Sequence, residues 1–498
     1  MAEPMRIGFL GAGHIATYHS KSIRRAATEL PFPIVRAGVF DPDTERRNNF
    51  AAASGHRPMD SVEDVLSTCD VVYVCTWTSE HRSLVEAAVR HGCAVFCEKP
   101  LGRDLSEARA VRDALAGTIN QVGLVLRHSP AYLMAARLTN DPRAGRVMSV
   151  VLRDDQFIPI QGHYGSSWRR DVTKSGAGTL LEHSIHDVDA LHAIVGPIDS
   201  VSARSSNFHG FDGIEDVVAA NFTFVSPDDV ASHGVLSSIW HDNLARPSLR
   251  RIEVFCENRF VAIEGDDWLG PVVWVDSDGT SGSLAGAELV TATRSMAHGH
   301  PNPDAAFLLA VHRHERAFPD AETALTAHLV VDAMYRSAAA DGAPVKVGSP
   351  RVRVERVGSE DVKPLRLDVL RRGMTNRTID FDGDDDSETV HLAAFDEAGA
   401  IIGVSTWMRR ESVDHPGRRA VQLRGMATAR HRQGAGVGAE LLLAGFAAAR
   451  ATGAEVVWAN ARDAALDFYR RHGMREVGEG FIESVTGLPH HRVVIELG

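Results

Sequence analysis

The first 125 residues alternate short apolar runs with stretches in which apolar residues recur at helical spacing. This order of strand and helix is typical of βαβ units, whose strands pair in parallel and are buried on both faces. Segment 80–90 has helical spacing and stops before Gly92, a residue suited to a helix C-terminus. The pattern predicts a doubly wound α/β domain over residues 1–125, with parallel strands at 6–10, 34–40, 70–75, 94–97 and 121–126.

A glycine-rich turn, Gly11-Ala12-Gly13, lies between the first strand and the first helix. Glycines permit a tight turn and the close approach of a pyrophosphate, and the helix N-terminus supplies free N–H groups and positive potential. Asp41 ends the second strand, where a carboxylate can hold both ribose hydroxyls of NAD and repel the 2′-phosphate of NADP. We expect NAD, with NADP less favoured. Alternatively, Asp41 is only a turn residue before Pro42.

Lys99 stands out because lysine is scarce: of 53 basic residues only five are lysines. Codon bias explains such a ratio, but lysine, unlike arginine, is a compact charge whose pKa can be tuned. Cys97-Glu98-Lys99-Pro100 ends the fourth predicted strand, at the carboxyl edge where α/β sheets bind ligands, and Pro100 favours an extended Lys99. A lysine at a strand end is often merely solvated. Here its scarcity and position favour a functional role.

The segment from Gly176 to Asp189 concentrates titratable residues. A helix beginning near Leu180 would place Glu182, His186 and Asp189 on one face. A carboxylate beside a histidine fixes its tautomer and raises its basicity, so His186 is a candidate general base for an alcohol proton. Two alternatives stay open: a metal site made by Glu182, His183 and His186, and a structural cluster of satisfied side chains.

With these segments in view, residues 1 to about 350 resemble the Gfo/Idh/MocA oxidoreductase family. The resemblance rests on Gly11-Ala12-Gly13-His14-Ile15-Ala16, Thr76-Trp77-Thr78-Ser79-Glu80-His81, Glu98-Lys99-Pro100 and Glu182 to Asp189. The usual family pattern has aspartate at the position of Glu182 and glycine at that of Ser184. The resemblance implies a Rossmann domain followed by a substrate domain with an open sheet, and oxidation or reduction of a sugar, sugar nucleotide or cyclitol with NAD(P).

The same resemblance implies roles for individual residues. Lys99 and His186 are expected to be catalytic, with Glu182 orienting His186. Besides Gly11, Gly13 and Asp41, the cofactor would contact His14, Ile15, Thr76, His81 and Glu98. The substrate cleft would be lined by Arg127, Trp168, Arg169, Lys174 and His183. These basic groups suit a carboxylated or phosphorylated sugar, although solvated arginines are an equal alternative.

After residue 125 the pattern changes to alternation of polar and apolar residues, typical of half-buried strands. We expect a substrate domain over residues 126–350, built on an open, mainly antiparallel sheet through which the protein forms a homo-oligomer. Glycine and proline then punctuate the chain, and residues 351–363 are expected to be a linker. The predicted strands are 147–153, 217–225, 234–240 and 250–255, and helices 305–317 and 323–339 are expected to close this domain.

Residues 364–498 form a further predicted domain, with strands at 391–395, 401–408, 420–427 and 455–459. Gln433-Gly434-Ala435-Gly436-Val437-Gly438 precedes the apolar helix 439–450 and again exposes N–H groups at a helix start, although such a turn is often loop chemistry alone. Asn460 ends the next strand, and Phe468-Tyr469 follows one helix later. The acidic run 382–386 is expected to be a solvated turn.

This arrangement resembles the GNAT acetyltransferase superfamily. The resemblance rests on the spacing of Gln433, Gly436 and Gly438, on Asn460 to Tyr469, and on the strand carrying Arg424 to Thr428. It implies that the glycine turn, Gly434 and Val437 included, holds the pyrophosphate of acetyl-CoA. It also implies that Met426, Ala427 and Thr428 align the pantetheine arm and that Tyr469 protonates the leaving thiolate. Tyr469 can alternatively be a core residue. Glu483, His490 and His491 are candidate bases, and a chain of waters is another.

Length and charge limit the remaining classes. The chain has 498 residues, enough for two to four domains, and its net charge of −12 gives no basic footprint for nucleic acid. Neither a signal peptide nor an apolar run of about 18 residues occurs, which predicts a cytoplasmic protein without a membrane partner. The five cysteines lie mostly in strand-like runs and suit reduced thiols, and no metal is expected.

Two coenzyme cradles on one chain predict a bifunctional enzyme of amino-sugar or aminocyclitol metabolism. One half would form a keto sugar, a separate aminotransferase would convert it, and the other half would N-acetylate the product. The alternative is that one half is a catalytically silent sensor or scaffold that only binds its nucleotide.

Overall fold

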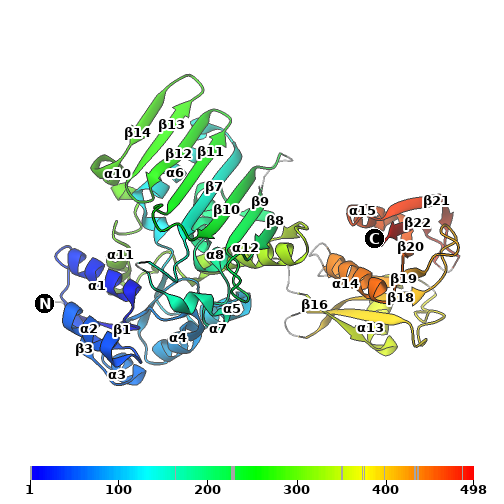
Figure 1. The fold of residues 1–498 in the computed structure, drawn as a ribbon, viewed down its shortest axis with the longest axis horizontal. Helices are drawn as coiled ribbons and strands as arrows, with labels where there is room; N and C mark the ends of the chain where they lie inside the picture. The colour runs from blue at the N-terminus through cyan, green and yellow to red at the C-terminus, as the bar shows by residue number, and fades with distance from the viewer. Residues whose placement is uncertain are drawn as a thin grey trace. The chain divides into compact units, whose positions relative to one another are not determined.

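The computed structural model divides into two compact units, Met1–Gly348 and Ser349–Gly498 (Figure 1). Each unit is described by itself. The structure describes residues 3–162, 164–225, 230–348, 352–372, 374, 376–396, 399–430, 433, 437–484 and 486–497, without the side chains of Asp467 and Arg471.

The N-terminal unit begins with a six-stranded parallel sheet, here sheet A, in the order β3-β2-β1-β4-β5-β6. The predicted doubly wound α/β domain is confirmed. The two-residue β3 escaped prediction because it is too short to show a period. The strands are β1 (Met5–Leu10), β2 (Ile34–Phe40), β3 (Arg57–Pro58), β4 (Val71–Val74), β5 (Ala94–Cys97) and β6 (Asn120–Val122), and the helices are α1 (His14–Ala26), α2 (Thr44–Ser54), α3 (Val62–Leu66), α4 (His81–Arg90) and α5 (Leu105–Ala114).

The second sheet of this unit, sheet B, has nine strands in the order β14-β13-β12-β11-β7-β10-β9-β8-β15. Only β7 and β10 pair in parallel, so the predicted open, mainly antiparallel sheet is confirmed. The strands are β7 (Val147–Phe157), β8 (Ile198–Ser206), β9 (Val217–Phe224), β10 (His233–His241), β11 (Leu249–Cys256), β12 (Arg259–Asp266), β13 (Gly270–Asp276), β14 (Ser281–Leu284) and β15 (Val345–Lys346).

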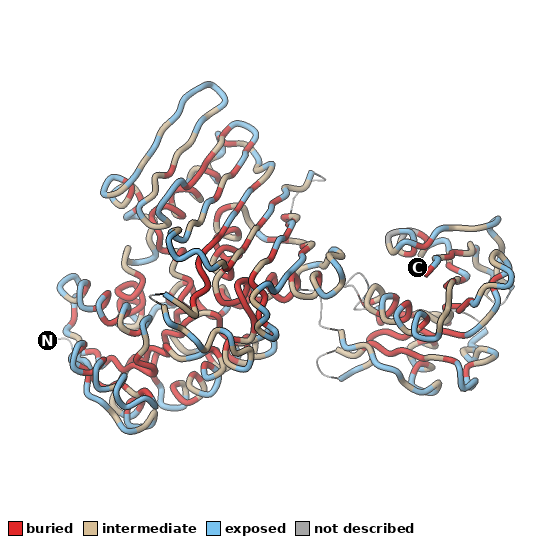
Figure 2. Tube along the Cα trace, in the orientation of Figure 1, coloured by how far each residue is buried: buried red, intermediate tan, exposed pale blue. Residues whose placement is uncertain are grey.

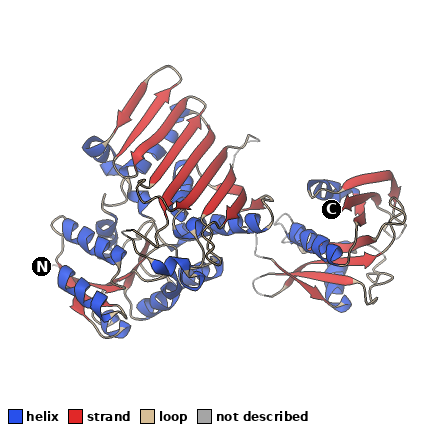
Figure 3. Cartoon of the chain, in the orientation of Figure 1, coloured by secondary structure: helices blue, strands red, loops and turns tan. Residues whose placement is uncertain are grey.

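Helices cover one face of sheet B and leave the other open (Figure 3). The alternation of buried and exposed residues along β9 and β10 follows from this one-sided cover. The helices after residue 125 are α6 (Pro130–Thr139), α7 (Val172–Ser175), α8 (Thr179–Glu182), α9 (Ile185–Ile194), α10 (Gly286–Thr293), α11 (Pro303–Arg313) and α12 (Ala321–Ala339).

Helix α11 does not close the substrate domain as expected. Its Phe307 and Leu308 pack into the same core as Phe9 and Tyr73 of sheet A. Helix α12 contributes its start to the other core of sheet A and its later turns to the core of sheet B. The chain therefore returns to the first domain, a pairing over about 300 residues that local spacing does not encode.

The C-terminal unit contains sheet C, in the order β16-β17-β18-β19-β20-β22-β21. Residues 353–357 are its first strand and pair antiparallel with β17, so the predicted linker is wrong: the alternation of Val352 and Val354 with the charged Arg353 and Glu355 was that of a strand. The elements are β16 (Arg353–Val357), α13 (Ser359–Leu370), β17 (Val390–Phe395), β18 (Ile401–Arg409), β19 (Ala420–Thr428), α14 (Val437–Ala451), β20 (Val456–Arg462), α15 (Leu466–Arg471), β21 (Arg475–Ile482) and β22 (Pro489–Glu496).

The two faces of sheet C carry different helices. One core joins Leu423, Val457 and Tyr469 to α14, and the other joins Ala427 and Val404 to α13. Buried backbone follows these strands and the sheet-facing sides of both helices (Figure 2). Among the described residues, no helix is long and apolar enough to cross a membrane.

Candidate active sites

The glycine turn between β1 and α1 has the geometry that a dinucleotide needs. Gly11 has φ +92°, and a Cβ there would lie 2.4 Å from the carbonyl oxygen of Cys75 at the end of β4. Gly13 is the N-cap of α1, no side chain caps that helix start, and a Cβ on Gly13 would meet nothing within 4 Å. The first N–H groups of α1 therefore face open space, which fits a diphosphate.

Asp41 is buried at the end of β2 and supports this turn. Its carboxylate accepts the N–H groups of Ala12 and Asp43, each at 2.9 Å, and lies 3.3 Å from the guanidinium of Arg46. Asp41 thus has a structural task besides the expected contact with ribose. The half-exposed Arg46 brings a positive charge to the same place.

Glu98 and Lys99 follow β5 at the carboxyl edge of sheet A. Glu98 accepts a hydrogen bond at 2.8 Å from His19, whose other ring nitrogen lies 2.7 Å from Asp304. All three residues are buried. Burial alone would lower the pKa of His19, but Asp304 and Glu98 outweigh it and raise that pKa to about 10. A buried imidazolium between two carboxylates therefore contacts Glu98, the residue that precedes Lys99.

Lys99 is half-buried, and its Nζ donates to the backbone carbonyl of Glu182. Burial lowers the pKa of Lys99, the nearby Arg169 lowers it further, and the charges of Glu182 and Glu98 oppose this shift. This hydrogen bond joins the Glu98-Lys99-Pro100 motif to the segment 176–189, so the structure brings two sequence-predicted motifs together.

The segment 176–189 is not one helix. α8 ends at Glu182, and α9 begins at Ile185. Ser184 lies in the break and its hydroxyl contacts Asp154 at 2.9 Å and Ser238 at 2.7 Å, which holds the chain out of helical geometry. The prediction of a single helical face is therefore wrong.

Glu182 does not orient His186 as expected. Its carboxylate accepts from the Thr78 hydroxyl at 3.0 Å and from Arg169 at 3.1 Å. Within the part of the chain that the structure describes, Nδ1 of His186 is buried without a hydrogen-bond partner. Burial, then the positive charges of Lys99 and Arg250, hold the pKa of His186 well below 6.5. His186 is therefore neutral at pH 7 and able to accept a proton.

Sequence reasoning missed Arg250, which anchors a buried charge cluster. Its guanidinium lies 2.6 Å from Asp187, 2.6 Å from Asp267 and 3.3 Å from Asp154. In β11 it occupies an ordinary position of an alternating strand, so no local signal marks it. His183 lies 3.0 Å from Asp154 and 3.2 Å from Arg250. A cation this close disfavours the alternative of a metal at His183.

The predicted substrate residues divide into two groups. Arg127 forms a bidentate pair with Asp189 at 2.7 and 2.9 Å, so its guanidinium is engaged in holding α9. His183 is likewise engaged elsewhere, with Asp154 and Arg250. Trp168, Arg169 and Lys174 gather on the segment 76–81 and on Glu182. Arg169 pairs with Glu182 and stacks on Trp168, 4.6 Å from the ring centroid, and Lys174 lies 4.3 Å from the ring centroid of Trp77. His81 contacts the Pro100 carbonyl at 2.9 Å and ties this segment to Lys99.

The second candidate site lies in sheet C. β19 and β20 pair in parallel only as far as Leu423 and Ala459, after which β19 stays with β18 and β20 stays with β22. The strands therefore separate, and residues 424–428 and 460–462 border a gap in which strand backbone lacks its usual neighbour. An extended arm can pair with such an edge.

Met426 and Tyr469 lie beside this gap on the α14 face, whereas Ala427 packs on the α13 side. Tyr469 is buried, its hydroxyl lies 4.0 Å from the sulfur of Met426, and burial raises its pKa to about 12. A protonated tyrosine suits the donation of a proton. Gln433 donates to the carbonyl of Thr428 at 3.2 Å, and a Cβ on Gly438 would lie 3.3 Å from Phe468. Gly434 and Gly436 lie outside the described residues.

The candidate bases of this unit are engaged in local contacts. Glu483 accepts from the N–H and the hydroxyl of Thr486, both at 2.8 Å. His490 contacts the Leu488 carbonyl at 2.9 Å, and His491 lies 2.8 Å from Asp463. The acidic run 382–386 is not simply solvated, because Asp384 is buried and lies 2.6 Å from the fully buried Arg366.

Three models of known protein families match parts of the chain. Residues 5–124 match the family model described as oxidoreductase family, NAD-binding Rossmann fold, and residues 132–261 match the GFO/IDH/MocA C-terminal domain. Residues 360–474 match the acetyltransferase (GNAT) family. The fold and sites thus define a Rossmann-fold oxidoreductase unit and a second, acyltransferase-like unit on one chain. The N-terminal unit belongs to the Gfo/Idh/MocA oxidoreductase family, and the C-terminal unit to the GNAT acetyltransferase family.

Among relatives, the chain is 29% identical over 231 residues to 1,5-anhydro-D-fructose reductase of Ensifer adhaerens. The matched region spans 44% of this chain and 66% of that protein. It is 26% identical over 260 residues to UDP-N-acetylglucosamine 3-dehydrogenase of Acidithiobacillus ferrooxidans, spanning 52% and 74%. The chain thus covers only part of each relative. A solved structure of levoglucosan dehydrogenase in complex with NADH and levoglucosan covers 70% of this chain and 100% of its own, with a TM-score of 0.61 and 18% identity.

Proposed function

We propose that the N-terminal unit is an NAD-dependent oxidoreductase acting on a CH–OH group of a sugar, sugar nucleotide or cyclitol. The observation that carries this proposal is His186, whose Nδ1 is buried without a partner among the residues that the structure describes and whose pKa burial and the charge of Lys99 hold well below 6.5. A neutral imidazole without a partner on Nδ1 and a nearby ammonium form a pair that can accept and donate a proton at one hydroxyl.

In this proposal the bound nicotinamide supplies the site that accepts the hydride. His186 takes the proton of the reacting hydroxyl. The Lys99 ammonium donates a hydrogen bond to the same oxygen as negative charge grows on it, and such a donor typically contributes about 10²–10³ in rate. Glu182 holds Lys99 through its backbone carbonyl, and its side chain fixes Thr78 and Arg169. Glu182 therefore positions Lys99 and Arg169 and does not orient His186.

The preference for NAD over NADP belongs to this proposal. The buried carboxylate of Asp41 would repel a 2′-phosphate. Arg46 works in the opposite direction, but its guanidinium is shared between Asp41 and Asp43, 3.1 Å away, which reduces its attraction for a further anion.

For the C-terminal unit we propose N-acyl transfer from acetyl-CoA. Acetyl-CoA supplies the acyl group. The bond between the amine nitrogen and the carbonyl carbon forms as the carbon–sulfur bond breaks, and the amine loses one proton. Tyr469 returns a proton to the leaving sulfur. Its high pKa keeps the hydroxyl protonated, so that it has a proton to give. The gap between β19 and β20 beside Met426 supports this assignment.

Together the two units favour a role in amino-sugar or aminocyclitol metabolism. The N-terminal unit would oxidise a hydroxyl, a separate aminotransferase would introduce an amine, and the C-terminal unit would then N-acetylate that amine. The likeness to a UDP-N-acetylglucosamine dehydrogenase supports a sugar-nucleotide substrate. All five cysteines are free and buried, which supports a reducing compartment such as the cytoplasm.

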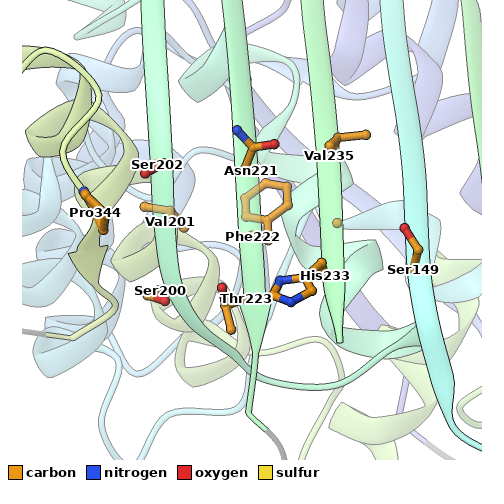
Figure 4. A pocket seen from close by; sticks show the side chains of 11 residues that line it. Ser149, Ser200, Val201, Ser202, Asn221, Phe222, Thr223, His233, Val235 and Pro344 are labelled. Atoms are coloured by element: carbon orange, nitrogen blue, oxygen red, sulfur yellow. The ribbon is translucent and has the colours of Figure 1, made fainter. Parts of the chain in front are cut away.

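We also propose that the open face of sheet B forms a homo-oligomer. This face has a hollow of about 280 Å³ near Pro344, in which Thr223 and His233 stand on adjacent strands (Figure 4). Val151 and Val235 are 39% and 40% exposed on the same face. Measuring the mass in solution by light scattering tests this; a monomer with this face free would contradict it.

The decisive test replaces the proposed pair. Lys99→Ala and His186→Ala should each abolish reduction of NAD by sugar and cyclitol substrates while leaving the affinity for NAD, measured by isothermal titration, nearly unchanged.

Titration with NAD and acetyl-CoA separately tests whether both cradles are functional. Wild-type turnover in both variants would refute the catalytic assignment, and failure to bind one coenzyme would favour a silent half that acts only as a scaffold.

A further inference from the structure

Three arginines border the gap between β19 and β20 on the face opposite α14. They are Arg424 of β19, Arg462 of β20 and Arg371, which follows α13. A bulge at Gly425, which has φ +57°, interrupts the alternation of β19, so that Arg424 faces α13 while Met426 packs on the α14 core. On β20, Ala459 and Ala461 belong to the α14 core, so Arg462 points to the α13 face as well. Met426 and Tyr469 therefore lie on one side of the opening, and Arg424 and Arg462 on the other.

Contacts of the three guanidinium groups place them along α13. Arg424 lies over the ring of Phe381 at 4.4 Å from its centroid, and Arg366 of α13 stacks on the same ring at 4.4 Å. Arg462 donates to the Leu370 carbonyl at 3.0 Å, and Arg371 donates to the same oxygen at 3.3 Å. The first contact is with Arg366 and the second with the carbonyl of Leu370, one turn further along α13.

These charges lack paired anions. Within the described residues, no carboxylate lies within ion-pair distance of Arg424, Arg462 or Arg371. The nearest acidic groups are engaged elsewhere: Asp384 with Arg366, Asp382 with Arg410, and Glu483 with Thr486. Arg371 is only 8% exposed.

Arg371 and Arg462 also crowd each other. Burial lowers the pKa of Arg462 and the charge of Arg371 lowers it further, while Glu483 opposes the shift. Burial and then Arg410 and Arg366 lower the pKa of Arg424, and Asp384 and Asp382 oppose that shift. Partly desolvated like charges are costly unless an anion binds between them. An exclusively structural role would be served better by pairing, as the buried Arg366 is paired with Asp384.

We propose that the amine substrate of the C-terminal unit carries an anionic group, a phosphate or a carboxylate, held by Arg424, Arg462 and Arg371 on the α13 face of the gap. This inference rests on the proposed acyl transfer. An acyl group that reaches the gap from the α14 face meets an amine held from the α13 face. Guanidinium groups suit both oxyanions because they bind them through two parallel hydrogen bonds.

The test uses the full chain and measures release of free thiol from acetyl-CoA with matched amines. These are glucosamine, glucosamine 6-phosphate, glucosaminuronic acid and a UDP-linked amino sugar, which separate neutral, phosphate, carboxylate and diphosphate acceptors. We expect kcat/KM at least about 30-fold higher for one charged acceptor than for glucosamine. Arg462→Gln should lower that value about tenfold, mainly through KM, with Arg462→Lys intermediate and glucosamine changed less than twofold. Arg419→Gln, an exposed arginine of the same unit, is the matched control.

Binding of inorganic pyrophosphate to the chain saturated with acetyl-CoA gives a second measurement, independent of turnover. Weaker binding in Arg462→Gln and Arg424→Gln, by about tenfold, would support the anion site. Equal affinities in all variants, no binding at all, or equal use of neutral and charged amines would overturn it. Failure of acetyl-CoA itself to bind would instead refute the proposed acyl transfer, so the two failures are distinguishable.

Discussion

At the scale of single residues, two buried histidines of the N-terminal unit take opposite charge states. His19 lies between the carboxylates of Asp304 and Glu98 and is protonated, whereas burial and the positive charges of Lys99 and Arg250 keep His186 neutral. Burial acts in the same direction on both rings, so the neighbouring charges decide. A charged His19 stabilises the environment of Lys99, and a neutral His186 can act as a base.

The pH dependence of alcohol oxidation follows from His186. Because the pKa of His186 is well below 6.5, kcat/KM should be flat from pH 6.5 upward and fall only at lower pH, where the ring becomes protonated and can no longer accept a proton. The alkaline limit should lie below 10.5, since Lys99 has a lowered pKa and loses its proton there. Initial rates of NAD reduction at subsaturating substrate measure this profile. An acidic limb centred at or above pH 6.5 would contradict the assignment.

Replacing His19 tests the buried cation. His19→Gln leaves Glu98 and Asp304 without their countercharge and should cost about 3–5 kcal/mol of stability. The folded pKa of about 10 exceeds the unfolded value of 6.5, so this contribution is complete below pH 6.5 and is lost as the pH rises through about 10. Chemical denaturation at pH 6 and pH 10.5 should show a large difference from wild type only at pH 6. The half-exposed His91, replaced by Gln, is the control, and an equal loss in both variants would be evidence against the buried cation.

At the scale of elements, the turn between β1 and α1 separates folding from binding. Gly11 is required by its positive φ and by the Cys75 carbonyl, whereas a Cβ on Gly13 enters open space. The break between α8 and α9 shows the same division of tasks: side-chain bonds of Ser184 end one helix, and the Glu182 carboxylate contacts Thr78 and Arg169 in place of His186.

Alanine at these two glycines should therefore give different results. Gly11→Ala should destabilise the N-terminal unit by about 1–3 kcal/mol or more, because the strained φ and the backbone clash act together. Gly13→Ala should leave the melting temperature nearly unchanged but weaken NAD, since its Cβ occupies the space expected for the diphosphate. Thermal melting and NAD titration measure the two effects. Similar NAD affinity for Gly13→Ala and wild type would refute the position of the cradle.

At the scale of the whole molecule, the chain forms two units with separate cores, and we expect them to unfold separately. In the C-terminal unit, α14 crosses β18 at Gly445, where a Cβ would lie 1.7 Å from the ring of Trp407. Gly445→Ala should destabilise this unit by about 2–3 kcal/mol, a shift of roughly 5–10 °C in its melting temperature.

Differential scanning calorimetry of the full chain checks this expectation. Only the transition of the C-terminal unit should move, while the second transition and the affinity for NAD serve as internal controls. A single transition that shifts as a whole would show that the two units unfold cooperatively.

The sequence alone predicted five of the six strands of sheet A, four of the nine strands of sheet B and four of the seven strands of sheet C, together with the two glycine turns and the family of each unit. These features depend on neighbours in the chain, since period, turn chemistry and helix starts are local. It failed where a local pattern had two meanings, as in residues 353–357, whose alternating charges belong to β16.

Only the tertiary structure decided which distant side chains meet. It joins His19 to Asp304 across 285 positions, brings Arg250 of β11 to Asp187, and turns the Glu182 side chain away from His186. Such pairings are selected by burial, because a charge removed from water must find a partner that the packing brings to it. No spacing in the sequence records that selection.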